Sequence, residues 1–186
     1  MSRLLVEEIP YGDPLAVFAG FAAWPGATFL DSARPDGAVA RYSFIMAEPF
    51  LTLKSRDGLI EDGVARYTGD PFKALAERLA LYPLEHEPGL PPFQTGAAGY
   101  FAYDLGRHLE RLPAHRIDDQ PLPDLLMGFY DWTIAFDHQE KRCFIMASGY
   151  PASSETARRR QAAARIAEIR ERLAQPAPLP SRPVIA

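Results

Sequence analysis

Residues 127–136 read MGFYDWTIAF and residues 142–147 read RCFIMA, with the polar residues 137–140 between them. In the first segment, large side chains occupy every second position: Tyr130, Trp132, Ile134 and Phe136. This period of two is typical of a strand that buries one face. Two such segments joined by a short polar turn predict an antiparallel β-hairpin, which is the clearest element of the chain.

Further short strands are predicted before this hairpin. Their residue ranges are 4–8, 27–32, 41–46, 50–54, 59–61 and 64–67. The steps Asp57-Gly58 and Asp62-Gly63 are strong turn signals, so the strands beside them should pair antiparallel. Residues 93–104 hold two glycines beside aromatic residues, which predicts a strand in close contact with another backbone.

Three helices are predicted around these strands. Two of them begin at an Asp-Pro pair, at residues 13 and 70, where the aspartate caps the helix and the proline suits its first turn. The first of them should end at Pro25. The last helix spans residues 153–174, with apolar residues at helical spacing and arginines on its other faces. The sequence therefore predicts an α+β fold of mainly antiparallel β-sheet with outer helices.

Charge and composition exclude several classes of partner. The 186 residues carry a formal net charge of -4, which argues against a nucleic-acid interface. The N-terminus has no signal-like apolar core, and no run approaches the ~18 apolar residues of a membrane span. The single Cys143 lies in a predicted apolar strand, where a thiol is usually a small buried hydrophobe. We therefore expect a cytoplasmic protein without nucleic-acid or membrane partners.

The residues by themselves reveal no active site. The segment from Gly96 to Gly99 lacks the other residues of the known nucleotide loops, and the four histidines lack metal-site spacing. Asp104, Arg107 and Glu110 form the densest charged set near aromatic residues. An arginine held by two carboxylates favours a salt-bridged corner over a catalytic pair, because catalytic acids need a raised pKa. We assign no catalytic, cofactor-binding or metal-binding residue to this chain.

Three segments, taken in order, resemble the N-terminal region of a family of chorismate-utilising enzymes. They are FLDS at 29–32 with RYSFI at 41–45, PFQTGAAGYFAYDLGR at 92–107, and GFYDW at 128–132 with DH at 137–138. This family contains component I of aminodeoxychorismate synthase (para-aminobenzoate synthase) and of anthranilate synthase. The YDLGR, YDW and DH stretches are more similar to the aminodeoxychorismate branch.

The resemblance implies an N-terminal domain at 1–174 and a proline-rich linker at 175–186, before a C-terminal catalytic domain that this sequence lacks. The complete enzyme would take ammonia from a glutamine amidotransferase subunit, component II, and add it to chorismate with Mg²⁺. The product would be 4-amino-4-deoxychorismate, for p-aminobenzoate and folate synthesis. The family's chorismate and Mg²⁺ residues lie in the C-terminal domain, so this chain alone should be inactive. The alternatives are the same domain of anthranilate synthase, a stand-alone amino-acid sensor, or an amidotransferase-interaction module.

The resemblance also implies a tryptophan pocket with one wall in the N-terminal domain. Its motif matches the residues Ser32, Val39, Ala40, Arg41 and Tyr42. The Ser32 hydroxyl is suited to accept the ammonium group of L-tryptophan, and the backbone of residues 39–42 is suited to frame the indole. In the alternative interpretation, Ser32 and Arg41 satisfy one another or nearby backbone groups.

Overall fold

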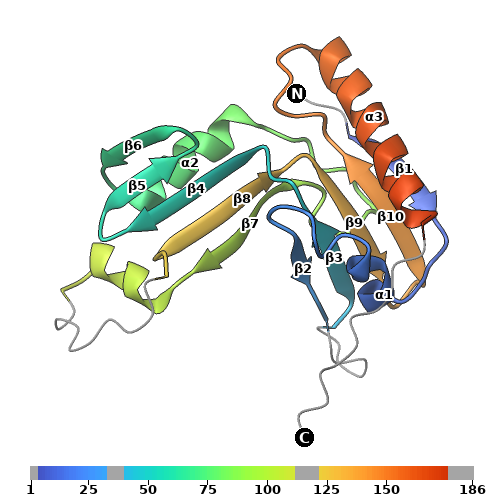
Figure 1. Cartoon of the computed structure of the whole chain (residues 1–186), viewed down its shortest axis with the longest axis horizontal. Helices are drawn as coiled ribbons and strands as arrows, with labels where there is room; N and C mark the ends of the chain where they lie inside the picture. Colours follow the sequence, from blue (N-terminus) through green and yellow to red (C-terminus); the bar gives the residue numbers. More distant parts are fainter. Residues whose placement is uncertain (1–3, 33–39, 112–121, 176–186) are drawn as a thin grey trace, which may run out of the picture.

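The computed structural model describes residues 4–32, 40–111 and 122–175. They form two five-stranded antiparallel sheets with helices packed against them, which confirms the predicted α+β fold (Figure 1). Sheet 1 has the strand order β1 (Leu5–Ile9), β10 (Arg142–Ala147), β9 (Trp132–Asp137), β3 (Tyr42–Met46) and β2 (Thr28–Leu30). Sheet 2 has the order β6 (Ala65–Thr68), β5 (Leu59–Asp62), β4 (Leu51–Arg56), β8 (Leu125–Tyr130) and β7 (Gly96–Phe101).

The predicted hairpin forms the centre of sheet 1. β9 and β10 pair antiparallel from Trp132 opposite Ala147 to Asp137 opposite Arg142, as the alternating pattern and polar turn predict. β3 lies on the other side of β9, and it pairs in turn with β2. The strands that carry residues 28–30 and 42–46 are therefore neighbours, as predicted.

The two sheets are joined by chain segments that continue from one sheet into the other. β8 passes into β9 through Asp131, and β3 passes into β4 through residues 47–50 (Figure 1). At Asp131 the alternation is interrupted, because Tyr130 packs with Met146 on one face of sheet 1 while Trp132 lies in the core of the other face. The prediction that Tyr130 and Trp132 share a face is therefore wrong, because the single residue between the strands breaks the period of two.

A large core lies between sheet 1 and α3 (Glu155–Leu173). Ser154 caps this helix by accepting a hydrogen bond from the Ala157 N–H at 3.2 Å. The buried residues of the helix are Ala162, Ile166 and Ile169, at the predicted helical spacing. They pack against alternate side chains of β9 and β10, among them Cys143. Its prediction as a core residue is confirmed, and burial raises the pKa of the Cys143 thiol to about 12.

α2 (Pro71–Leu81) packs on sheet 2, and its Asp70 cap accepts a hydrogen bond from the Phe72 N–H at 2.8 Å. α1 (Pro14–Ala19) is shorter than predicted. It ends at Gly20, and residues 20–24 form turns rather than helix. The predicted extension to Pro25 is therefore wrong, because glycine is a poor helix former and lies five residues before the proline.

β7 is the strand that the glycines predict, and it lies at the edge of sheet 2. Gly99 lies so close to β8 that a Cβ atom there would be 1.9 Å from the Leu126 carbonyl oxygen, so only glycine fits. A short 3-10 helix, η1 (Tyr103–His108), follows, and within it Arg107 contacts Asp104 at 3.2 Å. This contact is the Asp104 half of the predicted salt-bridged corner.

Candidate functional site

The predicted pocket residues lie where β2 ends and β3 begins. The strand pairing ends with Leu30 opposite Phe44, and Ser32 follows two residues after Leu30. The Ser32 hydroxyl donates a hydrogen bond to the Tyr42 carbonyl, and the Ser32 N–H donates to Ser43 Oγ at 3.0 Å. Ala40 precedes Arg41 in the chain, whereas Val39 lies outside the described residues. The structure therefore brings Ser32 and Tyr42 together through a hydrogen bond from the Ser32 side chain to the Tyr42 backbone carbonyl.

The Ser32 side chain is half-buried and keeps part of its hydrogen-bonding capacity. A hydroxyl has one proton to donate and two lone pairs that accept. Because its proton goes to the Tyr42 carbonyl, Ser32 Oγ is an oriented acceptor. An ammonium group is a donor without acceptor capacity, so it suits this oxygen.

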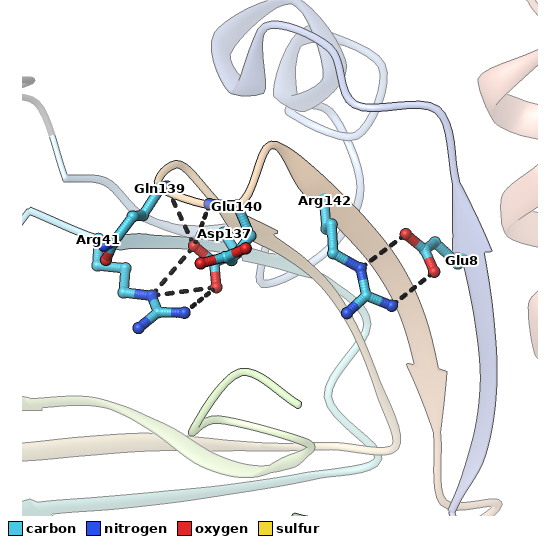
Figure 2. Close-up of polar contacts among 6 residues, drawn as sticks. All are labelled: Glu8, Arg41, Asp137, Gln139, Glu140 and Arg142. Atoms are coloured by element: carbon cyan, nitrogen blue, oxygen red, sulfur yellow. Dashed lines mark hydrogen bonds and ion pairs between the residues drawn. The ribbon is translucent and has the colours of Figure 1, made fainter. Parts of the chain in front are cut away.

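Arg41 is held away from Ser32 by Asp137 at the end of β9. Its Nε and Nη2 atoms contact the Asp137 carboxylate at 3.1 and 2.7 Å, and Figure 2 shows this two-point contact. The Gln139 and Glu140 N–H groups donate to the same carboxylate. Although burial alone would raise it, these hydrogen bonds hold the pKa of Asp137 below its ordinary value. Ser32 and Arg41 therefore bond to other partners and not to one another. The Ser32 hydroxyl bonds to a nearby backbone carbonyl, that of Tyr42.

A second arginine pair lies one strand away on sheet 1. Arg142 in β10 contacts both carboxylate oxygens of Glu8 in β1, at 2.9 and 2.7 Å (Figure 2). Its guanidinium lies 4.7 Å from the centre of the Phe144 ring. Both charges of this pair are about half exposed, so water solvates them. The pair is a surface contact beside the candidate site.

Two residues of the site were not predicted. Ser43 and His138 lie next to Ser32, and Ser43 Oγ is 2.7 Å from His138 Nε2. Ser43 pairs with Phe136 in the sheet, so the residue two positions after Phe136 is its diagonal neighbour. The order of β3 and β9 in the sheet would have revealed this contact, but local sequence patterns do not give that order.

Another pocket lies where β2 begins, at the opposite end of this strand from Ser32. It has a volume of about 340 Å³, and its lining includes Thr28, Tyr100, Gly128 and Tyr130. The Tyr130 hydroxyl donates to the Gly26 carbonyl at 2.9 Å and also contacts Thr28 Oγ1. Its polar groups are thus largely bonded to each other, and none of them carries a formal charge.

The described part of the chain offers no place for a metal ion. Within residues 4–32, 40–111 and 122–175, no three His, Cys, Asp or Glu residues gather in a way that could hold one. Among the same residues, no helix is long and apolar enough to cross a membrane.

Residues 26–185 match the family model described as chorismate binding enzyme. The chain belongs to this family. It is 36% identical over 146 residues to anthranilate synthase component 1 of Thermus thermophilus, which covers 78% of this chain and 31% of that protein. It is also 36% identical over 137 residues to aminodeoxychorismate synthase component 1 of Escherichia coli, which covers 70% of this chain and 30% of that protein. The predicted family membership is confirmed, and the chain spans about a third of the length of these curated relatives.

The fold agrees with this family. The crystal structure of anthranilate synthase component I from Streptococcus pneumoniae superposes with a TM-score of 0.59 over 88% of this chain and 37% of that one. The sequence identity in this comparison is 23%, so it supports the fold alone.

Proposed function

We propose that this chain is the N-terminal part of an aminodeoxychorismate synthase component I and supplies one wall of a tryptophan pocket. The observation that carries the proposal is the Ser32 hydroxyl at the end of β2, whose proton is held by the Tyr42 carbonyl. This leaves an oriented oxygen for the ammonium group of an amino acid. Tyr42 and the backbone after Ala40 lie beside it and would frame the indole.

The amination of chorismate belongs to the part of the protein that this chain does not include. A complete enzyme would use Mg²⁺ to bind chorismate, and the described residues present no matching group of carboxylates. Ammonia would come from a glutamine amidotransferase subunit, since the relatives are named as component 1 of their synthases. We expect the isolated chain to convert no chorismate when supplied with ammonia and Mg²⁺.

The tryptophan pocket is tested by calorimetric titration of the chain with L-tryptophan. Saturable binding by the wild type, lost in Ser32→Ala, supports the pocket. The matched control is Ser153→Ala, because Ser153 is exposed and lies before α3, on a different part of the fold. Equal binding by Ser32→Ala and the wild type would remove Ser32 from the site.

Anthranilate synthase component I is the second candidate, because relatives with that name reach 39% identity and relatives named aminodeoxychorismate synthase component 1 reach 36%. The YDW motif at the junction of β8 and β9 and the DH motif at the end of β9 favour the aminodeoxychorismate branch. Deletion of the gene discriminates the two. A requirement for p-aminobenzoate supports aminodeoxychorismate synthase, and a requirement for tryptophan supports anthranilate synthase.

A further inference from the structure

One buried hydroxyl connects Ser32 to three other polar groups. Ser43 lies in β3 and is 0% exposed. Its Oγ atom is 3.0 Å from the Ser32 N–H, 3.1 Å from Asp31 Oδ1 and 2.7 Å from His138 Nε2. Asp31 and Ser32, which follow β2, and His138, which follows β9, therefore all contact the Ser43 hydroxyl oxygen.

Counting protons assigns the direction of each of these hydrogen bonds. The Ser43 hydroxyl has one proton, and a carboxylate only accepts, so this proton goes to Asp31. The Ser32 N–H fills one of the two Ser43 lone pairs. The contact with His138 is then a hydrogen bond only if His138 Nε2 carries a proton and donates it.

The other side of the His138 ring agrees with this direction. The Tyr11 hydroxyl is 2.9 Å from His138 Nδ1, and it can donate to that nitrogen when Nε2 is the protonated one. The ring also stacks on Phe136, with centroids 6.4 Å apart and planes 15° apart. His138 is thus oriented by a hydrogen bond and by a ring contact.

We propose that His138 is a positioning residue that holds Ser32 for tryptophan through the shared hydroxyl of Ser43. The inference rests on the proposed tryptophan pocket. The Nε2–H group fixes Ser43, Ser43 fixes the Ser32 backbone, and the Tyr42 carbonyl fixes the Ser32 hydroxyl. Because the Ser32 backbone and the Ser32 hydroxyl are both held, the hydroxyl lone pairs keep one orientation before the ligand arrives. This lowers the entropic cost of binding.

A hydrolytic role for the Ser43 and His138 pair does not fit this geometry. A nucleophilic serine needs a histidine nitrogen that accepts its proton and a substrate that can reach its oxygen. Here the Ser43 proton goes to Asp31, and Ser43 is fully buried.

The hydrogen-bond directions can be measured without any ligand. Long-range proton–nitrogen NMR of the 186-residue chain at neutral pH should show the His138 ring protonated at Nε2 and not at Nδ1. The His138→Gln variant identifies the ring signals by their loss. The Ser32 amide signal should move in Ser43→Ala, because its acceptor is removed. A ring protonated only at Nδ1, or an unmoved Ser32 amide, would overturn the inference.

Titration with L-tryptophan then tests the consequence for the pocket. A glutamine side chain can place an N–H donor near the position of His138 Nε2, whereas leucine cannot. We expect His138→Leu to weaken tryptophan binding about tenfold, as for one lost hydrogen bond, and His138→Gln to stay within about threefold of the wild type. His108→Gln is the matched control, because His108 is exposed on η1. Amide spectra establish that each variant is folded, and Ser43→Ala replaces His138→Leu if leucine prevents folding.

The outcomes separate this inference from the pocket itself. If the wild type binds tryptophan and His138→Leu binds equally well, the inference fails and the pocket stands. If His138→Gln is as weak as His138→Leu, the ring shape and not the donor matters, and the inference also fails. If the wild type binds no tryptophan, the pocket and the role of His138 in it fail together, and only the NMR result still decides the hydrogen-bond network.

Discussion

The two ends of β9 carry buried aspartates in opposite electrostatic situations. Asp131 immediately precedes the strand and is 1% exposed, and Asp137 ends it and is 6% exposed. Neither carboxylate oxygen of Asp131 receives a hydrogen bond of normal length from the described residues, and Arg165 Nε lies 3.6 Å from Oδ1. Burial raises the pKa of Asp131, and the nearby Arg165 only partly offsets this.

Asp137 has the donors that Asp131 lacks. It receives two N–H groups from the turn after β9 and the guanidinium of Arg41 (Figure 2). Its pKa is lowered although burial acts in the other direction. Burial alone therefore does not decide whether a carboxylate stabilises this fold. What decides is how closely hydrogen-bond donors approach the carboxylate: the Arg41 guanidinium and two turn N–H groups contact Asp137, whereas Arg165 Nε lies 3.6 Å from Asp131.

The largest effect should come from removing Arg165, the cation that contacts Asp131. Arg165 projects from α3 and contacts Glu48 and Glu168 in addition to Asp131. Replacement with methionine keeps the apolar stem but leaves a buried carboxylate without compensation, which should cost about 3 kcal/mol of unfolding free energy. Urea denaturation measures this loss.

Two variants sharpen this first prediction. Arg159→Met on the exposed side of α3 is the matched control and should change stability little. The double variant Arg165→Met with Asp131→Asn should recover most of the loss, because it removes the buried charge. If the double variant is as unstable as Arg165→Met alone, packing of the arginine stem and not the charge of Asp131 explains the effect.

Exchanging each aspartate for asparagine compares the two ends of β9 directly. Asp137→Asn weakens the hydrogen bonds from Arg41 and should lower the unfolding free energy by about 1 kcal/mol, since one partner is partly solvated. Asp131→Asn removes a charge that Arg165 only partly compensates and keeps the shape, so it should be neutral or stabilising. Urea midpoints at neutral pH give both values. Equal losses in the two variants would contradict the contrast between the two ends.

The strand pattern was predictable and the junction between the sheets was not. Alternating large residues predicted the β9–β10 hairpin correctly, although β9 is buried on both faces and not on one. The same alternation runs unbroken through Asp131 in the sequence, so it could not reveal that β8 and β9 belong to different sheets. The point at which the chain passes from one sheet to the other depends on which strands pair with β8 and with β9, and most of these strands are distant in sequence.

The candidate site was predictable only in part for the same reason. Ser32, Arg41 and Tyr42 were predicted from a motif whose parts are close in sequence. Their partners Asp137 and His138 are about a hundred residues away, since the contacts of Arg41 with Asp137 and of Ser43 with His138 span 96 and 95 positions. They meet because β3 lies beside β9, an order that local patterns do not contain.

The pH dependence of these variants should have opposite signs. Asp137 has a lowered pKa, so its stabilising contribution is present above the ordinary carboxyl pKa and is lost as the pH falls through the lower folded value. Asp131 has a raised pKa, so its ionisation destabilises the fold as the pH rises from the ordinary value through the higher folded one.

Urea titrations of the wild type and both variants at a series of pH values measure this. As the pH rises, the stability of Asp137→Asn relative to wild type should fall, and that of Asp131→Asn should rise. Parallel trends would mean that both carboxyls titrate alike and that the donors in the turn have no effect.

The smallest effect should come from Glu8→Gln, which tests whether a two-point contact between an arginine and a carboxylate is by itself enough to stabilise the fold. Glu8 and Arg142 make the same two-point contact as Asp137 and Arg41, and Figure 2 places the pairs on the same sheet. Hydrogen bonds from Arg142 lower the pKa of Glu8, but both side chains are about half exposed, so water replaces much of what the substitution removes. We therefore expect an unchanged urea midpoint at physiological salt. A loss as large as that of Asp137→Asn would mean that the paired geometry, and not burial together with backbone donors, distinguishes Asp137 from Asp131.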